Sequence, residues 1–394
     1  MTIRELCAKA DQADLRLVRF LWCGNDGTTR AKASGRRGLE DRLHAGIGLT
    51  VAMQAMSGLD ELQPVAGMGP VGEVRLVPDI ETFWVLPDAP RTGVVLTDHM
   101  NLDGQPAPVC QRSFLKRMER RLAERGLVLR AAFENEFSLA TAVDGAYVPI
   151  DSALCFATIA MTAAQDYIDE LVDALEAQAI VLEQYYAELG HGQQEISTGH
   201  APALQAADEQ LLVRETIRAV ATQRGLVASL APKPWPENAG NGAHVHFSLW
   251  EGERNRFYEP SRPDGLSNEA RAFMAGVLAH LPGLCGLSAP SFNSYHRILP
   301  AALVGRRLHL LGLRQSRGPG ARRFAVPRLR GSLDQRRAQG LRRKLQPVPC
   351  ARGVDRLWAR RDRARPGAPR TGRRRPGHAA RGRAGAARDR AAAQ

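Results

Sequence analysis

The chain has 394 residues, which is enough for two or three domains and a sizeable apolar core. Its net charge of +13 averages two unlike parts: residues 301–394 hold 27 Lys and Arg against four Asp, a net of +23, whereas residues 1–300 carry 27 basic and 37 acidic residues, a net of −10. The high overall pI therefore says nothing about the partners of the first 300 residues, whose composition is that of an ordinary acidic soluble protein.

Several classes of protein are not expected from the N-terminus and the cysteines. Residues 1–23 lack a basic segment followed by an apolar run and a small-residue cleavage site, so secretion is not expected. No apolar stretch approaches the roughly 18–20 residues that span a bilayer. No membrane partner is therefore expected. The six cysteines are scattered without a C-x-x-C pair, which favours a reduced cytoplasmic protein with no cysteine-based metal site.

In chain order, the first predicted unit is small and rich in β-structure. Residues 1–104 contain many Gly and Pro residues and short β-like runs, such as 15–22 and 74–78. We place the domain boundary near 102–108 and assign 105–300 to a second, larger domain.

The second domain mixes helices and strands. Apolar residues recur at helical spacing over four segments, and period-2 alternation marks two others. We expect helices over 112–124, 163–180, 203–223 and from Ser267 toward Pro282, and strands over 128–139 and 243–250. The layout is α+β, not a regular βαβ alternation.

Carboxylates with a strand-like spacing are the first candidate functional residues. In E-N-E-F, Glu134 and Glu136 share one face of a strand, because alternate residues point to the same side. A second pair, Glu188 and Glu195, brackets E-L-G-H-G-Q-Q-E, whose glycines permit a tight bend between strands.

A third element, G-N-G-A-H-V-H-F-S-L-W, places His244, His246 and Ser248 on one strand face. Four acids and a histidine presented from strands suit hard divalent cations such as Mg²⁺ or Mn²⁺. Each motif by itself is better explained as a half-buried or solvated strand face, and only their order and combined spacing favour a site.

The ordered set of motifs resembles the glutamine synthetase family. The matching segments are E-N-E-F, the G-Q-Q-E turn, V-P-D-I-E-T at 77–82, K-P-W-P-E-N-A-G-N-G-A-H-V-H-F-S at 233–248 and N-S-Y-H-R at 293–297. The resemblance implies a β-grasp-like N-terminal domain, a catalytic domain of antiparallel sheet and helices that is incomplete here, and a homo-oligomer of two stacked hexameric rings. It also implies ATP with two Mg²⁺ or Mn²⁺ ions, and the substrates glutamate and ammonia or a small amine.

The same resemblance assigns roles to individual residues. It implies that one metal is held by Glu136, Glu188 and Glu195, and the other by Glu134 and His244. It places Lys233, His246 and Ser248 at the nucleotide, and Gly240 and Arg297 at the glutamate, with Arg297 as the catalytic residue. The implied reaction forms γ-glutamyl phosphate from ATP, which an amine then converts to a γ-glutamyl amide.

One departure from the family concerns the amine. Ammonia-using members carry an Asp-Gly-Ser-Ser motif in the N-terminal domain, and the corresponding stretch in this chain is A-M-S-G-L-D-E-L. Asp60 stands in this stretch, but its spacing does not match. The loss resembles the branch of γ-glutamyl-polyamine and related ligases, so both ammonia and an organic amine stay open.

A second departure begins at Pro300, after which no further family motif follows. When the codons of 309–311, 314–317, 324–328, 335–339 and 346–349 are read from their second base, they permit Thr-Cys-Trp, Asp-Asn-Arg-Glu, Ser-Pro-Phe-Arg-Gly, Asn-Val-Glu-Leu-Lys and Asn-Pro-Tyr-Leu in family order. We therefore expect 301–394 to be an out-of-frame, Arg-rich and disordered segment, and the activity of the chain to be impaired.

The rival interpretation is an inactive pseudoenzyme with a polyanion-binding tail. The tail has few aromatic residues for stacking on bases, and no specific nucleic-acid partner is expected.

Overall fold

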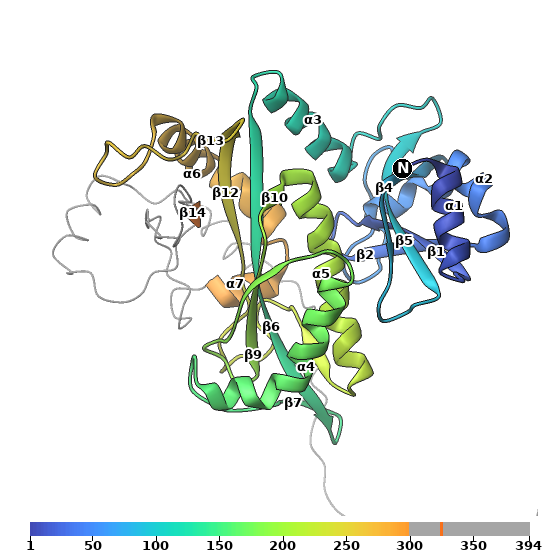
Figure 1. Ribbon diagram of the computed structural model, residues 1–394. Coiled ribbons are helices and arrows are strands. Elements are labelled where there is room, and N and C mark those ends of the chain that lie inside the picture. Colours follow the sequence, from blue (N-terminus) through green and yellow to red (C-terminus); the bar gives the residue numbers. More distant parts are fainter. Residues whose placement is uncertain (299–323, 326–394) are drawn as a thin grey trace, which may run out of the picture. The chain divides into compact units, whose positions relative to one another are not determined.

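The computed structural model describes residues 1–298 and the short strand Phe324–Ala325 (Figure 1). The sequence-based prediction of an out-of-frame, disordered tail over 301–394 lies outside these residues, apart from the backbone of that strand. The described chain is mixed α+β, as predicted.

The first sheet is built from the N-terminal residues. It has five strands in the order β2-β1-β5-β4-β3, and β1 runs parallel to β5 while the other pairs are antiparallel. The strands are β1 (Leu17–Cys23), β2 (Thr29–Gly35), β3 (Ile47–Thr50), β4 (Glu73–Val85) and β5 (Thr92–Asn101).

Two helices, α1 (Ile3–Gln12) and α2 (Leu39–Ala45), complete the core on one face of this sheet. Helix α1 begins at a capping box, in which the Thr2 hydroxyl accepts from the Glu5 amide and the Glu5 carboxylate accepts from the Thr2 amide. Alternation along β1 sends Val18 and Phe20 into this core, while Leu21 points to the other face and joins the largest apolar cluster.

The second sheet has nine strands within the described residues and carries the predicted motifs. Its main path is β13-β12-β6-β9-β8, with β7, β10, β11 and β14 paired beside it. These strands are β6 (Val128–Val143), β7 (Ala146–Pro149), β8 (Leu182–Ala187), β9 (Gln193–Thr198), β10 (Ala201–Pro202), β11 (Val227–Ser229), β12 (Ala243–Glu251), β13 (Arg254–Asn255) and β14 (Phe324–Ala325).

The two faces of this sheet differ in chemistry because strand alternation separates apolar from polar side chains. On one face, Phe137, Leu139 and Ile196 pack against α4 (Thr158–Glu176) and α5 (Ala203–Gln223) in the largest apolar cluster. Figure 1 shows α4 and α5 side by side next to β6 and β9. The opposite face carries the acids and histidines of the predicted motifs, and α7 (Phe292–Ile298) lies on that side.

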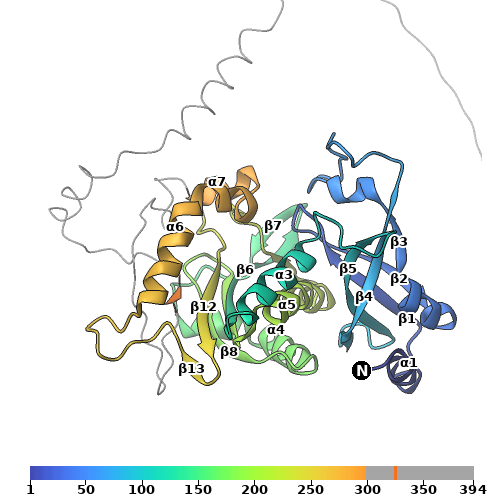
Figure 2. The same ribbon diagram turned by 90° about the horizontal axis from the view of Figure 1, so that it is seen from above.

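The helix predictions are confirmed for α3 (Gln111–Ala123) and α5, whereas two others need correction. Helix α4 begins at Thr158, before the predicted residue 163, and ends at Glu176. Helix α6 (Asn268–Ser288) is visible in Figure 2. It is capped by Ser267 as expected but runs through Pro282, which was predicted to end it. The proline removes one backbone donor, and the chain continues helical beyond it.

Helix α6 also corrects the expectation about apolar stretches. By length and composition alone it reaches the threshold for a membrane-crossing helix, with 6% of its apolar window buried. A single helix of this kind is weak evidence for a membrane protein. The five cysteines within the described residues are free thiols.

Candidate active site

Strand pairing brings the predicted acids and histidines together on one sheet face. Across the sheet, His244 of β12 is opposite Glu134 of β6, and Glu136 of β6 is opposite Glu195 of β9. One strand further, Tyr186 of β8 is opposite Glu195. Since directly opposite residues point to the same side, these side chains form a continuous polar surface.

The carboxylates on this surface are deeply buried. The exposed fractions are 7% for Glu134, 4% for Glu136, 3% for Glu188 and 0% for Glu195. Burying a carboxylate costs several kcal/mol unless hydrogen bonds or opposite charges compensate. The partners of each carboxylate therefore indicate what the site is built to hold.

Glu134 lies between two histidines. His244 Nδ1 is 3.3 Å from Glu134 Oε2, and His246 Nε2 is 3.0 Å from Glu134 Oε1. The predicted metal ligand His244 and the predicted nucleotide residue His246 thus both contact the same carboxylate.

Glu136 is held by donors from two other segments. Its Oε2 accepts from Gln193 Nε2 at 2.9 Å and from the Gly242 amide at 3.0 Å. Gln193 also bonds Asn241 Oδ1, and Asn241 in turn donates to the carbonyls of Ser229 and Ala231. This buried network fixes the glycine-rich loop against the β8–β9 turn.

The β8–β9 turn positions Glu188 and Glu195 as the glycine spacing predicted. The Glu188 amide bonds the Gln193 carbonyl, and Gly192 has a φ of +65° where an added Cβ would lie 2.5 Å from the Leu139 carbonyl oxygen. Only glycine fits this turn without displacement of the neighbouring strand.

Glu195 accepts a hydrogen bond of 2.6 Å from the Tyr186 hydroxyl. Burial, together with this bond and the neighbouring carboxylates, raises the pKa of Tyr186 well above its usual value. The hydroxyl therefore stays protonated and remains a donor near neutral pH. Sequence reasoning missed Tyr186 because only the β8–β9 register places it opposite Glu195.

Two sequence motifs that are distant in the chain contact each other beside the acids. The Lys233 amide donates to Asn293 Oδ1 at 2.7 Å, and Asn293 Nδ2 donates back to the Lys233 carbonyl at 2.9 Å. The Lys233 amine bonds the Asn238 carbonyl within the same loop. These contacts join the glycine-rich loop to α7.

Arg297 of α7 lies directly over this loop. A Cβ at Gly240 would be 2.8 Å from Arg297 Cγ, and a Cβ at Gly242 would be 3.7 Å from Arg297 Nη1 and 3.3 Å from Glu136 Oε1. The absence of a side chain at Gly240 thus permits the close approach of Arg297. The structure therefore brings Gly240 and Arg297, both predicted for substrate binding, next to Glu136.

Ser248 stands further along β12 on the same face as His246. It is buried, and its hydroxyl accepts from Trp250 Nε1 at 2.8 Å. Of the three predicted residues on β12, Ser248 lies furthest from His244 along the strand.

The residues present fit a divalent cation. Glu134, Glu195 and His244 each offer a ligand atom, and these atoms lie within 4.8 Å of one another. Two carboxylates and an imidazole are a donor set that suits Mg²⁺ or Mn²⁺. This grouping joins one residue from the predicted glutamate-side set with two from the predicted nucleotide-side set.

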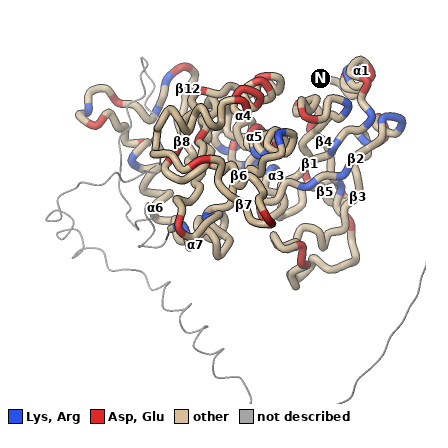
Figure 3. Tube along the Cα trace, turned by 90° about the horizontal axis from the view of Figure 1, so that it is seen from below, with Lys and Arg blue, Asp and Glu red and all other residues tan. Residues whose placement is uncertain are grey.

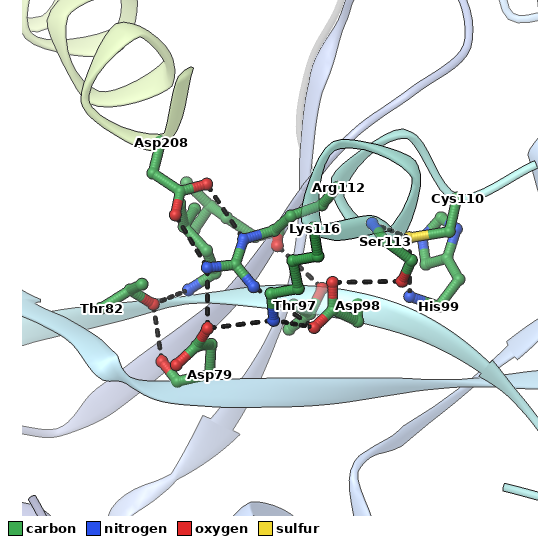
Figure 4. Close-up of polar contacts among 12 residues, drawn as sticks. Asp79, Thr82, Thr97, Asp98, His99, Cys110, Arg112, Ser113, Lys116 and Asp208 are labelled. Carbon is green, nitrogen blue, oxygen red and sulfur yellow. Dashed lines mark hydrogen bonds and ion pairs between the residues drawn. The ribbon is translucent and has the colours of Figure 1, made fainter. Parts of the chain in front are cut away.

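A second buried polar cluster lies between the first sheet and helices α3 and α5. Arg112 of α3 contacts Asp79, Asp98 and Asp208 at 2.8, 3.2 and 2.7 Å (Figure 4). Lys116 bonds Asp79 at 3.1 Å and Asp98 at 2.5 Å. The V-P-D-I-E-T motif thus supplies Asp79 to this cluster.

The stretch A-M-S-G-L-D-E-L forms part of a loop in which Asp60 has a φ of +57°. Asp60 pairs with Arg30 at 2.8 Å and its side chain is 75% exposed. It lies in the N-terminal part of the chain and is not among the described acids that could hold a metal.

Comparison with protein families covers nearly all of the described chain. The profile of the glutamine synthetase N-terminal domain matches residues 2–107, and that of the glutamine synthetase catalytic domain matches residues 108–308. The second match ends a few residues after the change in composition at Pro300.

Individual relatives agree with the profiles. A γ-glutamylpolyamine synthetase, GlnA3 of Streptomyces coelicolor, is 35% identical over 66% of this chain and 57% of its own length. A glutamine synthetase of Thermotoga maritima is 31% identical over 64% of this chain and 60% of its own length. The chain therefore spans about three fifths of these curated relatives.

Among solved structures, a novel glutamine synthase homolog superposes with a TM-score of 0.71 at 32% identity. The superposition covers 79% of this chain and 77% of that structure.

Proposed function

The chain belongs to the glutamine synthetase family, and on this premise we propose that it is an ATP-dependent ligase that joins the γ-carboxyl group of glutamate to ammonia or a small organic amine. The observation that carries the proposal is the polar sheet face, on which buried carboxylates and a histidine converge beside a glycine-rich loop and Arg297.

In this proposal two divalent cations occupy the polar face. Glu136, Glu188 and Glu195 hold one ion, Glu134 and His244 hold the other, and ATP lies near Lys233, His246 and Ser248. Bound Mg²⁺ or Mn²⁺ supplies positive charge where a transferring phosphoryl group is negative.

The protein's own groups orient the substrates. Arg297, set over Gly240 and close to Glu136, binds the glutamate and stabilises negative charge during the reaction. A γ-carboxylate oxygen of glutamate bonds to the γ-phosphorus of ATP, and ADP leaves. The amine nitrogen then bonds to the acyl carbon, phosphate leaves, and the nitrogen loses a proton.

The choice of amine rests on the N-terminal loop. Asp60 is bound to Arg30 and exposed, and the loop lacks the Asp-Gly-Ser-Ser motif. The loop therefore favours an organic amine as strongly as ammonia. The similarity to a γ-glutamylpolyamine synthetase supports an organic amine.

We further propose that residues 301–394 are read out of frame, that the functional form assembles as a homo-oligomer, and that it acts in the cytoplasm. The end of the catalytic-domain match at residue 308 supports the frame proposal. Sequencing the coding DNA across codons 295–350 tests it directly: a single-base insertion or deletion, or family motifs in the shifted frame, is the expected result. A shifted frame that does not resemble coding sequence would remove the proposal.

The activity itself is tested by phosphate release from ATP with Mg²⁺ and glutamate. Ammonia, methylamine and putrescine are each supplied as the amine, and the γ-glutamyl product is identified by mass spectrometry. Glu136→Gln is the inactive control, and Glu253→Gln, in the exposed turn between β12 and β13, is the matched surface control. Binding of ATP and Mg²⁺ without product, for every amine and for the frame-restored chain, would favour the pseudoenzyme instead.

A further inference from the structure

Tyr186 and Tyr185 are adjacent on β8 but serve opposite faces of the second sheet. Tyr185 faces the apolar side, where its hydroxyl donates to Gln194 Oε1 at 2.7 Å and its ring borders the largest apolar cluster. Tyr186 faces the polar side, where its hydroxyl donates to Glu195 Oε1 at 2.6 Å. Two tyrosine hydroxyls of β8 thus donate hydrogen bonds of similar length, and only that of Tyr186 lies in the candidate active site.

The bond from Tyr186 matters because of where Glu195 lies. Glu195 is 0% exposed, so no bulk water solvates its carboxylate. A donor on one oxygen restricts rotation of the carboxylate and lowers the cost of keeping it charged. In the same residue group, Glu134 and His244 bring ligand atoms within 4.8 Å of Glu195.

Tyr186 is itself held in place. Its ring meets that of Phe156 edge-on, with centroids 5.2 Å apart and planes at 77°. The Phe156 amide donates to the Ala187 carbonyl at 3.0 Å, which ties this loop residue to the end of β8. Phe156 adopts a φ of +60°, a costly conformation for a bulky residue that surrounding contacts must maintain.

Glu136 has a comparable arrangement, since Gln193 and the Gly242 amide both donate to its Oε2. Dedicated donors therefore orient two carboxylates of the polar face, one through an amide and one through a phenol. Such donors are common behind carboxylates that bind metals, and their removal typically weakens metal affinity by about 10- to 100-fold.

We propose that Tyr186 is a positioning residue, which orients Glu195 toward the divalent cation that Glu195 holds on the polar face together with Glu136 and Glu188. This inference rests on the proposed function, because that function requires the cation. It assigns a role to a residue that is not among the metal, glutamate and nucleotide residues of the proposed function.

The test measures Mn²⁺ binding by the full-length chain without substrates, by isothermal titration calorimetry and by the electron paramagnetic resonance signal of free Mn²⁺. Tyr186→Phe removes the hydroxyl and keeps the ring against Phe156. Tyr185→Phe is the matched control, because it removes a hydroxyl of similar bond length from the opposite face. We expect the first variant to bind Mn²⁺ about 10- to 100-fold more weakly and the second to bind within about twofold of the unaltered chain.

A general loss of structure is separated from a loss of orientation by a double-mutant comparison. If Tyr186 acts through Glu195, adding Tyr186→Phe to Glu195→Gln changes the remaining Mn²⁺ affinity little. Independent, additive effects, or equal weakening by Tyr185→Phe and Tyr186→Phe, would overturn the inference and leave the proposed function standing. If the unaltered chain binds no Mn²⁺, the proposed metal centre fails and this inference fails with it.

Discussion

At the scale of single residues, Arg112 is the clearest case of a side chain whose surroundings determine its importance. Three carboxylates converge on it, from β4, β5 and α5, and its own side chain is 11% exposed. Burial disfavours the guanidinium charge, but Asp208, Asp98 and Asp79 outweigh burial and raise the pKa of Arg112. The Arg112–Asp208 bond in this cluster joins residues 96 positions apart in the chain.

We expect Arg112→Met to destabilise the protein by about 3–5 kcal/mol, because it removes the cation that pairs with the buried Asp208 and leaves Asp79 and Asp98 with Lys116. Urea unfolding followed by circular dichroism measures the loss. The matched control is Arg218→Met on α5, whose pair with Glu215 is about two fifths exposed and is worth at most about 1 kcal/mol. Equal losses in the two variants would show that burial does not strengthen the dependence on Arg112.

His99 provides a residue-scale prediction for pH. Burial lowers its pKa below the usual value, although the charge of Asp98 acts in the opposite direction. The unfolded chain therefore binds a proton near pH 6.5 that the folded chain does not take up. Stability contributed by neutral His99 is present above pH 6.5 and is lost as the pH falls below it, by at most about 1.4 kcal/mol per pH unit.

His99→Gln removes this titration, so its unfolding free energy should change less between pH 7 and pH 5 than that of the unaltered chain. Urea titrations at half-unit steps give the two slopes. His280→Gln makes the same change at an exposed histidine and is the matched surface control. A His99 variant with an unchanged slope would assign the acid sensitivity to other groups.

At the scale of elements, the β8–β9 hairpin turn sets the spacing of Glu188 and Glu195. Gly192 in this turn combines a φ of +65° with backbone atoms at contact distance, since an added Cβ would lie 2.5 Å from the Leu139 carbonyl oxygen. Gly252, between β12 and β13, has a φ of +54° but nothing within 4 Å of the same added atom. Comparing Gly192 with Gly252 therefore distinguishes the cost of a left-handed backbone from the cost of a steric clash.

Gly252→Ala should therefore cost about 1 kcal/mol, the usual penalty for a left-handed residue with a side chain. Gly192→Ala should cost clearly more, about 3 kcal/mol or above, because the strand behind the turn must also move. Mn²⁺ affinity should fall only in the Gly192 variant, since the turn carries the candidate ligands. Similar unfolding free energies for the two variants would mean that the turn adapts without strain.

Much of this architecture was predictable from local patterns. Helical spacing located α3 and α5, and alternation located β6 and β12 with the correct faces for Glu134 and His244. Pro282 misled the prediction for α6, because the rule that proline ends a helix is only a tendency.

The contacts that could not be predicted from the sequence are those that depend on pairing between distant segments. Tyr186 is an unremarkable strand residue until β9 places Glu195 opposite it. The sequence around Asp79 gives no local signal of its partners, Arg112 and Lys116. Both partners lie on α3, and Arg112 is 33 positions further along the chain. Period and propensity describe one segment at a time, whereas these roles arise from register and tertiary packing.

At the scale of the whole molecule, the net charge changes sign near Pro300. Figure 3 shows acidic and basic residues interspersed along the described chain, and residues 1–300 have a net charge of −10. The remaining residues carry +23, with no Glu and a single Lys. A composition dominated by Arg, Ala, Gly and Pro is what a shifted reading of GC-rich codons produces, in agreement with the frame proposal.

The frame proposal makes a quantitative prediction for the intact protein. Restoring the frame after Pro300 returns Asn-Val-Glu-Leu, the source of the last metal ligand that the family resemblance implies, and the arginines of Asp-Asn-Arg-Glu. Positioned ligands and cations of this kind are each worth about 10²- to 10³-fold in rate. We expect the frame-restored chain to form γ-glutamyl amide at least about 100-fold faster than the unaltered 394-residue chain, and to elute as a larger homo-oligomer when size-exclusion chromatography is coupled to light scattering.

A chain ending at residue 300 is the necessary control, because it removes the basic segment without restoring the motifs and should gain no activity. If that truncated chain matches the restored one, the basic segment inhibits an otherwise complete enzyme. If the unaltered chain is already as fast and as large as the restored one, the family motifs beyond Pro300 are dispensable and the reading-frame account is wrong.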